Sequence, residues 1–258
     1  MKKSLLSLFI ISVVIAGCAD ESDKLDNESR LSVECYSRAS EYAEKGLVRD
    51  FGMYITESDP SYGSIVNPVH VMWSGDNWSF PSLSLSDKSI TLAAFYPYDV
   101  NSVITSVPMQ LSGQVDYLAS ASYTASNESP RISFTMDHLL TCIKVSIDSS
   151  SDVTLTAQDV PMEASYNMST HTTSLYSSIG SLSGNSELLL FPEMRSISLR
   201  VSYGGKVYQY VTPRIDFEKG KKYAFNLTVD RTENLQLVGD VLVTPWAPGG
   251  NYDGVVKN

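Results

Sequence analysis

The stretch "SISLRVSYGGKVYQYVT", residues 196–212, consists of two alternating runs of apolar and polar residues joined by Gly204-Gly205. A two-residue glycine loop between such runs predicts a tight β-hairpin. Facing residues of a hairpin share one face of the sheet. By this register four side chains form one apolar patch: Leu199, Val201, Tyr208 and Tyr210. The stretch therefore predicts a half-buried antiparallel sheet.

Most other apolar stretches are equally short and alternating, with turn-forming residues between them. The expected strands are 31–35, 51–55, 69–73, 90–96, 132–136, 143–147, 187–191, 223–229 and 241–243. The alternation changes phase between 132–136 and 143–147. Since a slip of one residue turns every side chain over, we expect a bulge or a corner near His138. One stretch, 39–45, has a helix-like pattern, and it is short.

Residues 119–130 are poor in large apolar side chains, and we place a domain boundary there, near Ser129. The pattern predicts an all-β chain with two tandem antiparallel β-sandwich domains, residues 30–129 and 130–258. The second domain is expected to end in a flexible tail rich in proline and glycine.

The N-terminus has the features of a bacterial export signal. Two lysines precede a run of roughly a dozen apolar residues, which is shorter than the ~20 that span a bilayer. Residues 15–18, "IAGC", resemble a lipobox, which predicts a signal peptide over 1–17 and acylation of Cys18. An ordinary cleaved signal is the alternative. The acidic residues of segment 18–29 fit either a solvated linker or a surface-export tag.

Composition excludes one class of partner. Removal of residues 1–17 lowers the count of Lys plus Arg from 19 to 17 against 29 acidic residues, so the mature net charge is −12. A chain this acidic repels phosphate backbones, and we expect no nucleic-acid partner. Cys35 and Cys142 could form a disulfide or stay as buried free thiols, and the sequence leaves both open.

The sequence holds few candidates for chemistry. It has no nucleophile-elbow, metalloprotease, dinucleotide or phosphate-loop motif, and no cysteine–histidine spacing resembles a zinc site. We therefore predict no enzyme, no cofactor and no metal. Of the three histidines, we expect a structural role for His70, a backbone hydrogen bond for His138 and solvent exposure for His171. Trp73 and Trp78 flank a turn and either pack on the core or bind a sugar.

Five stretches, in order, resemble the fimbrillins of the Bacteroidota, the type V pilins and their Mfa-like relatives. "FGMY" (51–54) is similar to the family's "FGVY", and "ITLAAFYPY" (90–98) to "ITFFAYYPY". "FTMDHLLTCIKV" (134–145) is similar to "FKHALAKVKF", although 137–142 lacks the family's small alanines. "EKGKKYAFNLTV" (218–229) and "VTPWAPGG" (243–250) resemble "GKKYTYTITL" and the closing "PW..GG".

This resemblance implies two transthyretin-like sandwiches in a pilus subunit that reaches the outer membrane and cell surface as a lipoprotein. It also implies that a protease cuts after an arginine and removes the first strand, and that a strand of the next subunit replaces it. The candidate cut sites are Arg30, Arg38 and Arg49, of which we prefer Arg38. The candidate donor strand is 238–244, with Val238, Val241 and Val243.

The partners implied are other fimbrillin subunits, identical or different, and the outer membrane through the lipid. A second hypothesis is a monomeric surface lipoprotein or a tip adhesin that binds a glycan or a host protein. A tip subunit would keep the groove that the removed first strand leaves, but it would lack a usable donor strand.

Overall fold

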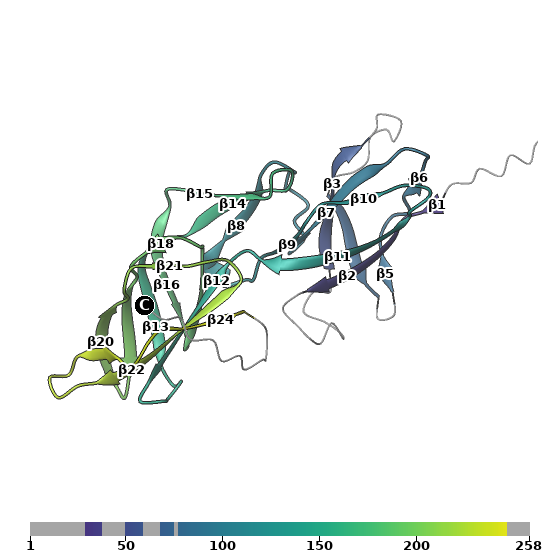
Figure 1. Cartoon of the computed structure of the whole chain (residues 1–258). Coiled ribbons are helices and arrows are strands. Elements are labelled where there is room, and N and C mark those ends of the chain that lie inside the picture. The colour runs from purple at the N-terminus through teal and green to yellow at the C-terminus, as the bar shows by residue number, and fades with distance from the viewer. Residues whose placement is uncertain (1–28, 38–49, 59–67, 75–76, 247–258) are drawn as a thin grey trace, which may run out of the picture.

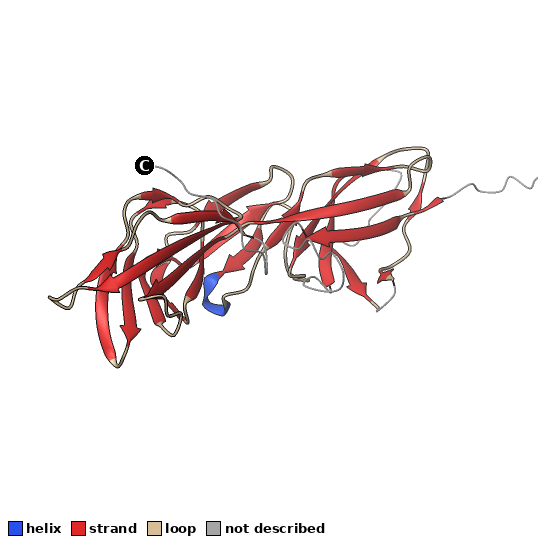
Figure 2. Ribbon diagram, turned by 60° about the horizontal axis from the view of Figure 1, so that its bottom comes forward, coloured by secondary structure: helices blue, strands red, loops and turns tan. Residues whose placement is uncertain are grey.

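The protein, a computed structural model, forms an elongated molecule of two β lobes (Figure 1). The structure describes residues 29–37, 50–58, 68–74 and 77–246. Strands account for nearly all regular structure in these ranges, and the short helix drawn in blue in Figure 2 is η2 (Leu111–Gly113). The prediction of an all-β chain is confirmed.

One eight-stranded sheet dominates the N-terminal lobe. Its strands, in spatial order, are β2 (Ser32–Ser37), β11 (Arg131–His138), β9 (Leu118–Ser120), β7 (Ile90–Tyr96), β3 (Asp50–Ser58), β4 (Val69–Trp73) and β5 (Trp78–Ser79), with β10 (Tyr123–Ala125) also on β7. In a separate pair, β1 (Ser29–Arg30), at the start of the described chain, lies antiparallel to β6 (Ser84–Leu85). The core of this lobe is centred on Phe51, Leu92 and Phe134.

Two sheets form a sandwich in the C-terminal lobe. The five-stranded sheet holds β17 (Glu187–Leu190), β12 (Thr141–Ile147), β22 (Lys221–Val229), β23 (Leu235–Leu237) and β24 (Leu242–Pro245). The four-stranded sheet holds β16 (Ile179–Gly184), β13 (Thr154–Pro161), β19 (Ser198–Tyr203) and β20 (Lys206–Val211). Ile143 and Phe225 from the first sheet share one core with Leu155 and Leu199 from the second.

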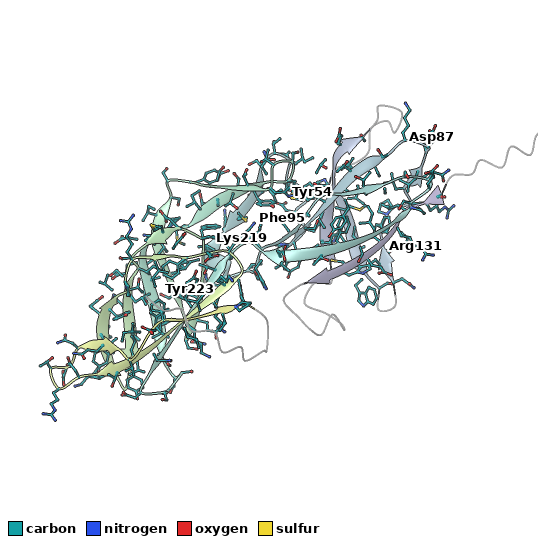
Figure 3. The ribbon with its side chains drawn as sticks, viewed as in Figure 1. Tyr54, Asp87, Phe95, Arg131, Lys219 and Tyr223 are labelled. Carbon is teal, nitrogen blue, oxygen red and sulfur yellow. The ribbon has the colours of Figure 1, made fainter. Side chains whose placement is uncertain are left out.

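Smaller sheets complete this lobe, and its core reaches the other lobe. The remaining pairs are β15 (Thr172–Leu175), β14 (Glu163–Asn167) and β8 (Val107–Gln110) in one sheet, and β18 (Met194–Arg195) with β21 (Ile215–Asp216). Tyr54 on β3 and Phe95 on β7 belong to the C-terminal core, although their strands lie in the N-terminal sheet. Figure 3 shows both side chains where the lobes meet. The lobes are therefore packed against each other.

The hairpin expected at 196–212 is present with the predicted register. Leu199 pairs with Tyr210 and Val201 with Tyr208. Both leucine and valine are fully buried, and the two tyrosines pack against the same core. The turn glycines have φ of 57° and 76°, a left-handed conformation that glycine adopts without steric cost.

The phase change near His138 is a corner, as predicted. β11 ends at His138 in the N-terminal sheet, and β12 begins at Thr141 in the five-stranded sheet. The apolar side chains on both sides of the corner are buried, because those of β11 face the N-terminal core and those of β12 face the C-terminal core.

The change of sheet does not fall at Ser129. β11 follows that residue yet pairs with β2 and β9, whereas β8 precedes it yet pairs with β14 of the C-terminal lobe. The boundary drawn from composition therefore lies inside the N-terminal sheet. Short polar strands such as β10 carry little apolar signal, which explains the misplacement. The signal peptide, most of the acidic linker and the helix-like stretch 39–45 lie outside the described residues.

Candidate assembly interface

The first long strand, β2, lies at the edge of the N-terminal sheet. It runs parallel to β11 over six residue pairs, from Ser32 opposite Arg131 to Ser37 opposite Met136. Among the described residues β2 pairs with no other strand. Removing it would uncover the backbone donors and acceptors along one side of β11, and such an open edge accepts a new strand readily.

Side chains from β2 and the residue before it fill part of the N-terminal core. Leu31 and Val33 are each only 6% exposed, and Cys35 packs partly buried beside them. They join a cluster that includes Ile132, Phe134 and Met136 of β11. Ser32 and Glu34 point to solvent. Loss of the segment would therefore leave an apolar slot as well as an open edge.

Of the candidate cut sites, the structure describes one. Arg30 lies on β1, before β2, with its side chain exposed. Arg38, Arg49 and the candidate lipidation residue Cys18 lie outside the described residues.

The candidate donor segment lies along the outer side of β22. β24 pairs antiparallel with β22 over four residues, and β23 pairs with the other end of the same strand. Val241 and Val243 pack partly buried against the C-terminal core, whereas Val238 is 54% exposed. The segment is thus docked on its own lobe by short pairing.

A cavity of about 290 Å³ lies beside this segment. Its lining residues are Pro213, Arg214, Ile215, Leu237, Gly239, Asp240, Val241 and Val243. Val241 and Val243 thus border this pocket on one side and the C-terminal core on the other, so the candidate donor strand is only partly enclosed.

Another edge strand, β17, is covered by the side chain of Gln114, which no sequence pattern marks as functional. The Gln114 amide accepts from Leu189 N–H at 2.8 Å and donates to Leu189 O at 3.1 Å, as a neighbouring strand would. Gln114 itself adopts a left-handed conformation with φ of 47°. This amide occupies backbone groups that would otherwise be open to strand addition.

The burial of the cysteines and the contacts of the histidines indicate structural roles for these residues. Cys35 and Cys142 are both free thiols, and burial raises the pKa of each to about 12. His70 stacks on Tyr98 and lies 3.2 Å from the Asp50 carboxylate. One expectation is wrong, because His138 contacts Asp116 rather than a backbone group. His171 is half-buried between Ser122 and Tyr166, while its neighbours Thr170 and Thr172 are exposed.

The two tryptophans that flank the turn, Trp73 and Trp78, differ in whether they pack on the core. Trp78 packs edge-on against Phe51 of the N-terminal core, and Trp73 contacts Trp78 while staying 36% exposed. Within the described ranges no cluster of side chains suits a metal ion. No helix in those ranges is long and apolar enough to cross a membrane.

Comparison with protein families decides the identity of the chain. The model of the family described as fimbrillin-like matches residues 57–246. The chain belongs to the fimbrillin-like family. No curated protein sequence matches it. Membership in this family of structural surface proteins supports a role as a fimbrial subunit at the cell surface and gives no indication of an enzyme.

Solved structures share the fold of this fimbrillin-like chain. A candidate cell adhesion protein from Bacteroides uniformis is 15% identical with a TM-score of 0.66, covering 86% of this chain and 100% of its own. A second from Bacteroides ovatus is 16% identical with a TM-score of 0.62, covering 89% and 100%. A fimbrial protein from Bacteroides vulgatus is 13% identical with a TM-score of 0.54, covering 84% and 99%.

Proposed function

We propose that this fimbrillin-like chain is a structural subunit of a surface fimbria and joins its neighbours by donor-strand exchange. In this mechanism a protease removes β2, and a strand of the next subunit takes its place beside β11. The observation that carries the proposal is the edge position of β2 combined with the burial of Leu31 and Val33 in the N-terminal core.

The energetics favour a durable joint. Each restored ladder hydrogen bond contributes about 1 kcal/mol net, and each buried valine or leucine side chain adds about 1.5–3 kcal/mol. A donor that renews the pairing of β11 and refills the positions of Leu31 and Val33 would gain several such contributions at once. The vacated slot, in contrast, would expose apolar side chains to water.

The position of the cut follows from the order of the elements. A cut after Arg30 would leave β2 attached to the rest of the chain, because β2 begins at Ser32. A cut after Arg38 or Arg49 would separate it. Arg38 is the preferred site since it follows the last residue of β2 directly.

The proposed donor is 238–244. Val241 and Val243 are spaced two residues apart, as are Leu31 and Val33, so both donor side chains would face the slot in an extended strand. To act as donor, the segment must first leave β22. Its four-residue pairing and only partly buried side chains mean that this release costs less free energy than that of a fully buried strand.

Export as a lipoprotein completes the proposal. Acylation of Cys18 would hold the precursor at the outer membrane, and the acidic residues after it would direct it to the cell surface. Its partners would be other fimbrillin subunits of the same or a different kind, and the fibre would contribute to adhesion. We include no nucleic acid among its partners because of the negative charge of the chain.

One observation favours a second candidate, a tip subunit that binds a glycan or a host protein. β24 is docked on β22 in its own lobe, and a subunit that kept it there would offer a groove but no donor. Such a subunit would end a fibre rather than extend it.

Limited trypsin digestion of the purified mature chain, followed by sizing and SDS gels, tests the proposal. Cleavage near residue 38 should release β2 and yield SDS-resistant ladders. Val243→Asp should abolish the ladders, whereas Val211→Asp, at a valine exposed on β20, should not. A cut chain that binds a synthetic 238–246 peptide yet stays monomeric would support the tip subunit. A cut chain that neither polymerises nor binds the peptide would refute donor-strand exchange.

A further inference from the structure

Trp246, the residue that follows β24, stacks on His138, the last residue of β11. The ring centroids lie 4.1 Å apart with the planes inclined by 17°. The Trp246 N–H also donates to Gly220 O at 2.8 Å, and the Gly220 N–H donates to Leu140 O at 2.8 Å. The end of the candidate donor segment is thus tied to the corner at which β11 passes into β12.

The imidazole of His138 is enclosed. Its side chain is 5% exposed, and Nδ1 lies 2.7 Å from Asp116 Oδ2, at ion-pair distance but without hydrogen-bond alignment. Nε2 is buried without a hydrogen-bond partner among the described residues. A buried polar atom with no partner is destabilising relative to a hydrated one. Departure of Trp246 would therefore lose ring stacking but allow water to reach His138.

This contact matters because the pairing and burial of the segment are limited in extent. No side chain from 241 to 246 is fully buried, the strand pairs over four residues, and the 290 Å³ cavity adjoins it. Stacking of two aromatic rings stabilises beyond area burial, so this one contact changes the docked population by about two- to tenfold.

We propose that the His138–Trp246 stack is a latch that keeps the donor segment docked on its own chain until β2 is removed. The proposal rests on the donor-strand mechanism above and adds its regulation. The same strand, β11, would receive the incoming donor and would hold the chain's own donor in place. Subunits would then release their donor only after their groove has opened, which prevents premature joining.

The pairing of β11 supplies the physical link. β2 pairs with β11 from Arg131 to Met136, whereas β9 pairs with it only from Met136 to His138. Without β2, the first five residues of β11 have no ladder partner among the described strands. The ladder pairing of the strand is then confined to its last three residues, which include the residue that supports Trp246, while its core side chains lose the cover of Leu31 and Val33. Increased motion of β11 would therefore reach the stack directly.

Hydrogen exchange of the full mature chain, resolved by mass spectrometry, tests the latch. The amides of residues 242–244 and of Trp246 should exchange about tenfold faster in His138→Ala and no faster than wild type in His138→Phe, which keeps a flat ring for stacking. His70→Ala is the matched control, because His70 also stacks on an aromatic ring but lies away from β24. Trp246→Ala should reproduce the effect and leaves β11 intact, should His138→Ala fail to fold. The amides of β7 report global stability.

The link to β2 is measured on the wild-type chain after limited trypsin cleavage, at a dilution where sizing shows monomer. Exchange in 242–246 should rise about tenfold after the cut, and ladders of His138→Ala should form faster than those of wild type. Unchanged exchange in both His138→Ala and Trp246→Ala would overturn the latch, and unchanged exchange after the cut would overturn its control by β2. Absence of ladders in every variant would refute donor-strand exchange instead, while the exchange data would still decide the latch.

Discussion

Leu31→Ala tests how firmly the removable strand fills the N-terminal core. Leu31 is 6% exposed and belongs to the cluster around Phe134. Fully buried Leu→Ala substitutions destabilise by about 2–5 kcal/mol. Because Leu31 lies beside an edge strand that can shift into the gap, we expect the low end, about 2–3 kcal/mol. With a urea m-value of about 2–3 kcal/mol/M, the unfolding midpoint should fall by about 1 M.

Urea titration followed by tryptophan fluorescence measures this loss, since Trp73 and Trp78 lie in this lobe and Trp246 packs against the other. Ser32→Ala is the matched control, since Ser32 lies next to Leu31 with its side chain in solvent, and it should shift the free energy of unfolding by less than about 0.5 kcal/mol. The same loss would weaken retention of β2 after cleavage by more than tenfold, as 1.4 kcal/mol corresponds to a factor of ten. Equal midpoints for the two variants would refute the conclusion that Leu31 fills part of the N-terminal core.

Three further results are expected. Gly205→Ala, at φ of 76° with open space around the added methyl, should destabilise by about 1 kcal/mol through the backbone alone, while Gly205→Asn should be nearly neutral in thermal denaturation. Gln114→Ala should lower the free energy of unfolding by about 1–3 kcal/mol and promote self-association on sizing, because it opens the edge of β17 at Leu189. Gln209→Ala, at an exposed glutamine on β20, is the matched control and should do neither. Burial raises the pKa of the Cys35 and Cys142 thiols from about 8.5 in the unfolded chain to about 12 in the folded chain. The contribution of the two buried thiols to stability is therefore complete below about pH 8.5 and falls as the pH rises toward about 12. Urea midpoints should accordingly be lower at about pH 10.5 than at about pH 7.5.

Several strands could be read directly from residue order. The runs at 69–73 and 90–96 coincide with β4 and β7, and the hairpin around Gly204-Gly205 has the predicted register. Alternation suffices there because one face of each strand must meet a core and the other must not. The corner near His138 followed from the same rule, since a change of phase requires a change in what the side chains face.

Contacts between distant residues were beyond such reasoning. The Gln114–Leu189 pairing joins residues 75 positions apart, and polar residues in loops carry no periodic signal for their partners. The loop of His171 is largely in solvent as expected, but the contact of its ring with Ser122 of the other lobe could not be predicted. The edge position of β2 likewise depends on sheet order, which alternation does not specify.

Local patterning alone determined that this chain is all-β, where many of its strands lie and which of their side chains face inward, because these features depend on residues two positions apart. Only the tertiary structure decided that the change of sheet falls after β11 rather than at Ser129, that β2 closes an edge, and that Trp246 rests on His138. These features depend on which segments meet in space, and that choice is made by the packing of whole strands against one another.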